Sequence, residues 1–174
     1  MKVESATLGT IVKAVGLRGE VKFVPGPDFW PEALKAGELE LTSPSEIRRA
    51  VHLTRYRTKG ETFILTISGI ESMSDAEDLV GSELRISLET LDESSRPHKL
   101  LPFQVIGLEV RLRDGSHVGN VVDLLLGKAQ HCLIVAREEE RFLVPNVPDV
   151  VSEVHLEEGY IEIDPPEGLL DLRW

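Results

Sequence analysis

Short segments of alternating apolar and polar residues run along most of the chain, separated by turns rich in glycine, proline or charge. Such closely spaced segments are typical of β-strands in small barrels or sandwiches. In the first half they predict six strands: Ala6–Lys13, Glu20–Val24, Glu38–Leu41, Ile47–Arg57, Thr62–Ile67 and Glu83–Ile86. In the second half they predict strands at Glu109–Arg113, Val118–Leu126, His131–Ala136, Arg141–Val144 and Tyr160–Ile163.

Turn and cap signals refine this pattern. Lys59-Gly60 and Asp114-Gly115 each stand between two predicted strands and predict hairpin turns. One short helix is predicted in the first half, with Ser74 as its cap, Glu77 completing a capping box and Gly81 closing its C-terminus. No helix is predicted in the second half.

The composition changes at Leu91–Pro102, which is polar, contains serine and proline, and has neither helical nor strand periodicity. This is typical of a linker. We therefore expect an N-terminal domain of residues 1–90, a linker of residues 91–102 and a C-terminal domain of residues 103–174. The predicted fold class is mainly all-β, with two small β-barrel domains joined by a short linker and one short helix in the first.

Charge is unevenly distributed within a formal net charge of −11. Residues 1–90 carry 11 basic and 14 acidic residues, whereas residues 91–174 carry 8 and 16. An acidic second half is repelled by nucleic-acid phosphates and attracted to basic proteins, although acidity also simply keeps a protein soluble. No apolar run approaches the roughly 20 residues of a membrane span, and no signal sequence is evident, so we expect a cytoplasmic protein.

Catalytic and metal-binding signatures are not found. The sequence has no phosphate-binding glycine loop, no GxSxG elbow, no HExxH motif and no paired histidines, and its single cysteine, Cys132, is predicted to be a buried small hydrophobe. Neither a metal nor another cofactor is expected, and the protein is not expected to be an enzyme. For a hydrolase on a barrel, the least implausible acids are Asp114, Asp123 and Asp164.

Features suited to binding are better represented. The stretch Gly9–Lys22, GTIVKAVGLRGEVK, predicts a hairpin whose bend contains Gly16 and Gly19. Three cations surround this bend: Lys13, Arg18 and Lys22. A second group lies on the Ile47–Gly60 segment around Tyr56: Arg48, Arg49, Arg55, Arg57 and Lys59. These cations could contact phosphate while Tyr56 stacks on a base, or they could protect an edge strand.

Two apolar groups pose a choice between a domain core and a partner surface. They are Leu100, Leu101 and Phe103 at the linker exit, and Leu169, Leu170, Leu172 and Trp174 at the C-terminal end. The C-terminal group is expected more often to pack back on its own barrel than on a partner.

Two of these segments together resemble one family. GTIVKAVGLRGEVKF is similar to the N-terminal signature of the RimM ribosome maturation factors, roughly G-x-I-x-K-x-H-G-L-x-G-E-V-K. VIGLEVRLRDGSHVGNVVDLL and FLVPNVPDVVSEVHLEEGYIEIDPPEGLL resemble the PRC-type barrel of the same family. Val15 replaces a frequent histidine of the first motif, and Leu100-Leu101 replaces a tyrosine pair, which keeps the apolar surface without hydroxyls or ring faces.

The resemblance implies a non-enzymatic chaperone that helps the head of the small ribosomal subunit mature and its rRNA be processed. It implies binding of the small-subunit ribosomal protein numbered nineteen, which is basic. We expect the protein to be a monomer. Residues expected near rRNA or the ribosome are Lys13, Gly16, Arg18, Gly19 and Lys22. Residues expected at the protein partner are Leu100, Leu101, Phe103, Leu169 and Leu170. The alternative is a PRC-barrel module for electron transfer or another protein interaction, which would need an anchor or cofactor ligands.

Overall fold

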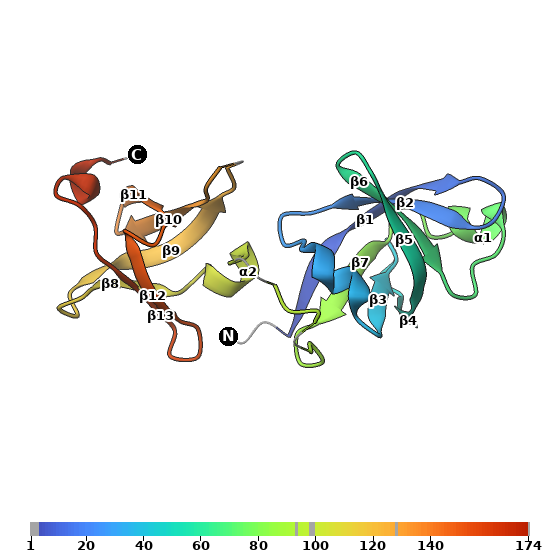
Figure 1. Cartoon of the computed structure of the whole chain (residues 1–174), viewed down its shortest axis with the longest axis horizontal. Coiled ribbons are helices and arrows are strands. Elements are labelled where there is room, and N and C mark those ends of the chain that lie inside the picture. Colours follow the sequence, from blue (N-terminus) through green and yellow to red (C-terminus); the bar gives the residue numbers. More distant parts are fainter. Residues whose placement is uncertain (1–3, 93, 98–99, 128, 174) are drawn as a thin grey trace. The chain divides into compact units, whose positions relative to one another are not determined.

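The computed structural model describes residues 4–92, 94–97, 100–127 and 129–173. The chain divides into two compact units, Met1–Lys99 and Leu100–Trp174, called unit 1 and unit 2 below (Figure 1). Each unit is built on one sheet, and the predicted fold class of two small β-barrel domains is confirmed. Glu93, His98 and Lys99 of the predicted linker, and Trp174 of the apolar end, lie outside the described residues.

Unit 1 contains a seven-stranded antiparallel sheet in the order β4-β3-β7-β1-β2-β6-β5. Its strands are β1 (Ser5–Val15), β2 (Glu20–Pro25), β3 (Leu39–Thr42), β4 (Arg48–Val51), β5 (Leu53–Lys59), β6 (Thr62–Ile67) and β7 (Glu83–Ser87). The register of β1 shifts twice, between Thr7 and Gly9 and between Ile11 and Lys13. Such bulges bend a strand, which lets β1 pair with β7 and β2 around one core.

The prediction of a single strand over Ile47–Arg57 is wrong, because the chain turns at His52 and divides it into β4 and β5. These two strands occupy opposite ends of the strand order with a single residue between them, so the sheet curls until its two edges meet at His52. The carbonyl of His52 accepts a hydrogen bond from the Ser68 amide at 2.9 Å, and its ring nitrogen Nδ1 contacts the Gly37 carbonyl. Lys59-Gly60 forms the predicted hairpin turn, with Gly60 at a φ of 64°.

The helix of unit 1, α1 (Met73–Glu77), begins two residues earlier than predicted. Two overlapping capping boxes are present in the sequence, and the structure uses Ser72 with Asp75 rather than Ser74 with Glu77. Ser72 has the extended backbone that an N-cap requires, and its hydroxyl accepts from the Asp75 amide at 3.1 Å. A 3₁₀ helix, η1 (Pro31–Lys35), precedes β3.

Unit 2 contains a six-stranded sheet in the order β11-β10-β9-β8-β13-β12, in which only β13 and β8 run parallel. Its strands are β8 (Glu109–Leu112), β9 (His117–Leu125), β10 (Cys132–Arg137), β11 (Glu140–Pro145), β12 (Val151–His155) and β13 (Tyr160–Ile163). The sequence pattern missed β12, whose five residues lack a strict alternation. The predicted turn at Asp114-Gly115 is confirmed, since it connects β8 to β9.

The expectation of a second half without helix is wrong. A four-residue helix, α2 (Pro102–Val105), opens the barrel, and a 3₁₀ helix, η2 (Leu169–Asp171), lies near its end. Proline fits the first helical position because its missing N–H would have no partner there, and the Gln104 side chain accepts from the Leu101 amide at 3.0 Å.

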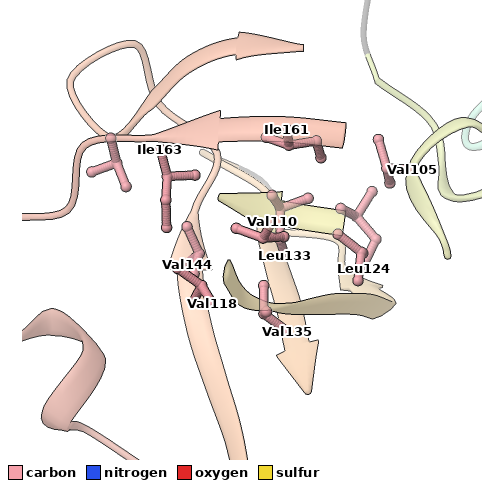
Figure 2. Packing of buried hydrophobic residues seen from close by; sticks show 11 residues of the cluster. Val105, Val110, Val118, Leu124, Leu133, Val135, Val144, Ile161 and Ile163 are labelled. Carbon is pink, nitrogen blue, oxygen red and sulfur yellow. The ribbon is translucent and has the colours of Figure 1, made fainter. Parts of the chain in front are cut away.

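The core of unit 2 consists of aliphatic side chains from α2 and the sheet (Figure 2). Its labelled members are Val105, Val110, Val118, Leu124, Leu133, Val135, Val144, Ile161 and Ile163. Cys132 lies at the start of β10 and is half-buried, so the prediction that it would be a buried residue holds only in part.

Candidate functional site

The predicted glycine-hinged hairpin is present as β1 and β2. The two strands pair from Gly9 opposite Pro25 to Val15 opposite Glu20, and a four-residue turn connects them. Gly16 and Gly19 have φ values of 66° and 83°, in the left-handed region that side chains disfavour. The bend therefore depends on glycine at both positions.

Gly19 also permits a close approach of backbone to backbone. A Cβ atom built on it would lie 2.5 Å from the carbonyl oxygen of Ile70 and 3.0 Å from the amide of Glu71. The surface that approaches the bend is thus this chain's own segment before α1. Gly16, in contrast, has nothing within 4 Å of such a Cβ and faces open space.

The tip of the hairpin exposes an apolar side chain that the sequence reasoning did not single out. Leu17 is 81% exposed, and Arg18 beside it is exposed too. The exposure of Leu17 could have been predicted from the sequence, because a leucine between two glycines in a four-residue turn has no strand face on which to be buried.

The hairpin cations differ in position. Lys13 and Lys22 stand directly opposite each other on β1 and β2, whereas Arg18 lies in the turn. Opposed residues share one face of a sheet, and this face is the outer one because the neighbouring pair, Ala14 and Val21, is buried. Like charges directly opposite each other destabilise a sheet, so this pair is not explained by folding.

The second cationic group is divided by the bend at His52. Arg48 and Arg49 belong to β4, and the other cations, Arg55, Arg57 and Lys59, belong to β5. Tyr56 pairs with the fully buried Leu65 and so lies on the inner face, away from the arginines before and after it. The register therefore gives no support to stacking of Tyr56 on a base among these cations.

In unit 2 most of the apolar residues expected at a partner surface contact the core. Leu100, Leu169 and Leu170 are partly buried against it, and Leu101 is only 8% exposed. The other residue of the set, Phe103, is half-buried on α2. The C-terminal segment packs back on its own barrel, where η2 lies against β11, whereas Leu172 stays 70% exposed.

An ordered stack of side chains covers the outer face of β12, β13 and β8. The rings of His155 and Tyr160 are 4.3 Å apart at an interplanar angle of 23°, and the Arg111 guanidinium lies 4.6 Å from the Tyr160 ring centroid. Arg111 donates to Glu109 at 2.7 Å. This hydrogen bond lowers the pKa of the Glu109 carboxyl, and desolvation raises the pKa of the Tyr160 hydroxyl. The sequence did not reveal the stack because β12 was not predicted.

Carboxylates surround this stack. Glu153 on β12 stands directly opposite Glu162 on β13, and Arg113 forms ion pairs with Glu162 at 4.0 Å and with Asp164 at 3.4 Å. His155 contacts Glu153 at 3.1 Å. The face therefore combines an aromatic–arginine centre with an anionic rim.

The three candidate acids do not converge. Asp164 follows β13 and Asp114 follows β8 at the same end of the sheet, because Ile163 pairs with Leu112. Asp123 lies beyond the other end of β8, three residues past the pair of Asn120 with Glu109, or about 10 Å along β9. Their arrangement supplies no shared pocket for acid–base chemistry.

Among the described residues, no group of three or more histidine, cysteine, aspartate or glutamate side chains is placed to hold a metal ion. Among the helices that the structure describes, none is long and apolar enough to cross a membrane.

Comparison with known families matches both units in order. The RimM N-terminal domain family matches residues 6–91, and the RimM PRC barrel domain family matches residues 102–169. The curated ribosome maturation factor RimM of Synechococcus sp. (strain WH7803) is 34% identical over 95% of this chain and 95% of its own length. That of Prochlorococcus marinus (strain NATL2A) is 31% identical over 95% of this chain and 96% of its own.

Two solved structures also match this chain. The crystal structure of a putative 16S ribosomal RNA processing protein RimM from Pseudomonas aeruginosa is 24% identical, with a TM-score of 0.48, and the match covers 94% of this chain and 98% of that one. The solution structure of the N-terminal domain of RimM from Thermus thermophilus is 17% identical, with a TM-score of 0.42, over 52% of this chain and 96% of that one.

Proposed function

This chain belongs to the RimM family of ribosome maturation factors, and from that premise we propose that it assists assembly of the small ribosomal subunit without catalysing a reaction. The observation that carries the proposal is the match of both family domains, in order, to residues 6–91 and 102–169. In this role the protein stabilises an assembly-competent arrangement by binding it more tightly than other states, and it then dissociates.

Unit 2 is proposed to bind a basic ribosomal protein, the small-subunit protein numbered nineteen. The acidic excess of residues 91–174 supports this partner, since complementary charge steers association. The outer face of β12, β13 and β8 is the suitable contact surface because Tyr160 and Arg111 are of the residue types that dominate interface energies. Leu101 and the other core-contacting leucines then support the barrel from within rather than meeting the partner.

Unit 1 is proposed to lie against the rRNA of the same subunit. Its support is the set of cations on the β1–β2 hairpin, in a chain whose net charge otherwise opposes contact with phosphate. Two surfaces of opposite charge would let one molecule bridge a basic protein and an RNA.

Sedimentation of cell extracts tests the role as a whole. The factor is expected to migrate with free small subunits and to be absent from translating ribosomes. Recovery only at the top of the gradient at low salt, or equally on translating ribosomes, would contradict the proposal.

Calorimetric titration tests the protein partner with the full chain. Ribosomal protein nineteen should bind with an affinity that falls as salt rises, and Tyr160→Ala should weaken binding about tenfold or more. Tyr160→Phe retains the ring and is the matched control. An equally basic small-subunit protein that bound as tightly would reduce the interaction to non-specific charge attraction.

A further inference from the structure

We propose that the RNA-binding surface of unit 1 is the outer face of β1, β2, β6 and β5, rather than the glycine bend. This inference rests on the proposed function and identifies the phosphate contacts within it. The surface, called the cationic face below, is defined by five side chains: Lys13, Lys22, Arg55, Arg57 and Lys59.

The register of four neighbouring strands aligns cations that are far apart in the sequence. Lys13 on β1 pairs with Lys22 on β2, Lys22 pairs with Ile64 on β6, and Ile64 pairs with Arg57 on β5. Paired residues share a face, and adjacent strands lie about 4.8 Å apart, so this row extends across about 14 Å of sheet. The hairpin cations and the β5 cations therefore form one surface.

The edge strand β5 extends the row along its own axis. Arg55 pairs with Thr66 and Lys59 pairs with Thr62, so both lie on the same face as Arg57. Residues two positions apart in a strand lie about 6.8 Å from each other. All three side chains are exposed and can reach phosphates arranged along a nucleic-acid strand.

Basic residues are concentrated on this face, although the chain is acidic overall. The four strands together contain five basic residues, and all five lie on the outer face. They contain one acidic residue, Glu20, which accepts from Arg57 at 3.4 Å. A second carboxylate, Glu61, lies in the turn between β5 and β6.

The middle of the row shows how the cations are supported. Ile64 stands on the outer face between Lys22 and Arg57, yet it is only 1% exposed. Long basic side chains characteristically cover apolar surface with their stems while their charged ends stay in water. Such packing orders the stems and reduces the entropy that the side chains would lose on binding.

The glycine bend is less suited to phosphate. Through Gly19 it contacts the segment at Ile70 that leads into α1. That segment and the helix carry four carboxylates close together in sequence: Glu71, Asp75, Glu77 and Asp78. Repulsion from these groups opposes a phosphate near Arg18, so the bend shapes the hairpin while the strand face makes the contact.

The test compares two matched pairs of arginines in the full chain. Arg55→Gln/Arg57→Gln removes two charges from the cationic face, and Arg48→Gln/Arg49→Gln removes two from the other edge strand, β4. Binding to a fluorescein-labelled 20-nucleotide single-stranded RNA is measured from 50 to 200 mM salt. The first variant should bind about tenfold more weakly and reduce the slope of log K against log salt by about 1.4, whereas the second should change little.

A third variant probes the opposite direction. Glu20→Gln removes the one carboxylate of the face and frees Arg57, so affinity for the RNA should rise about threefold or more. Equal losses for the two arginine pairs, or no gain from Glu20→Gln, would overturn the inference. Circular dichroism spectra that match the parent confirm that each variant is folded.

Binding to purified small subunits distinguishes this inference from the proposed function. If the parent protein does not sediment with subunits, the proposed function fails, whereas the RNA measurement still tests the face. If the parent sediments and Arg55→Gln/Arg57→Gln sediments equally well, only the cationic face is refuted. Loss of subunit binding with unchanged affinity for the free RNA would identify a ribosomal protein as the occupant and would also refute the inference.

Discussion

The two units present the same kind of sheet with opposite charge on its outer face. In unit 1, Lys13 stands directly opposite Lys22, and in unit 2, Glu153 stands directly opposite Glu162. Such like-charged pairs weaken a sheet, so neither serves folding. Under the proposed function, each barrel would retain this repulsion because the face binds a partner of the opposite charge.

The two faces also differ in what lies between their charges. On unit 1 a buried Ile64 separates the cations, whereas on unit 2 the stacked His155 and Tyr160 occupy the centre. A cationic surface without an exposed aromatic suits the continuous charge of a phosphate backbone. An aromatic–arginine centre within an acidic rim suits a folded basic protein. Under the proposed function, two β-barrels would achieve two kinds of recognition through their surface residues alone.

The largest expected effect comes from creating a cavity in the core of one unit while leaving the core of the other unchanged. Leu65 in unit 1 and Leu133 in unit 2 are both fully buried, and substitution of either by alanine should cost about 3 kcal/mol of unfolding free energy. Leu65→Ala should weaken RNA binding more than binding of the basic protein, and Leu133→Ala should weaken binding of the basic protein more than RNA binding. Urea denaturation followed by circular dichroism, together with both binding assays, measures this, and equal loss of both activities in both variants would contradict a division of labour.

A smaller effect is expected at the hairpin of unit 1. Gly19→Ala would combine a left-handed backbone with a Cβ 2.5 Å from the Ile70 carbonyl oxygen, and should cost about 2 kcal/mol or more. Gly16→Ala has the same backbone requirement but open space, and should cost about 1 kcal/mol. The difference between the two midpoints in urea isolates the close approach, and equal midpoints would show that the segment before α1 can move away.

Local sequence patterns predicted the strands well, because alternation reports which residues of a strand face the core. The hairpin at Gly16 and Gly19 was predictable for a different reason, because glycine marks a bend directly. Pairing between distant strands was not predictable. No local pattern places Arg57 in line with Lys22, because register across a sheet depends on bulges and on the order of strands. His155 and Tyr160 pair across a single hairpin, and they were missed because β12 was not predicted. The candidate surfaces are products of that register.

The smallest expected effect on stability tests the comparison most directly. Lys13→Glu would place a carboxylate opposite Lys22, and Glu153→Lys would place an ammonium opposite Glu162. Replacing repulsion by attraction should raise the unfolding free energy by about 0.5 kcal/mol for Lys13→Glu. The gain should be smaller for Glu153→Lys, because that change also removes the contact of Glu153 with His155. Each variant should nevertheless bind its own target more weakly, Lys13→Glu the RNA and Glu153→Lys the basic protein. Because a change that merely damaged the fold would lower both quantities, a gain in thermal midpoint alongside a loss of affinity is the signature of a face kept for binding. If either variant is more stable and binds as well as the parent, the like-charged pair on that unit has no role in recognition.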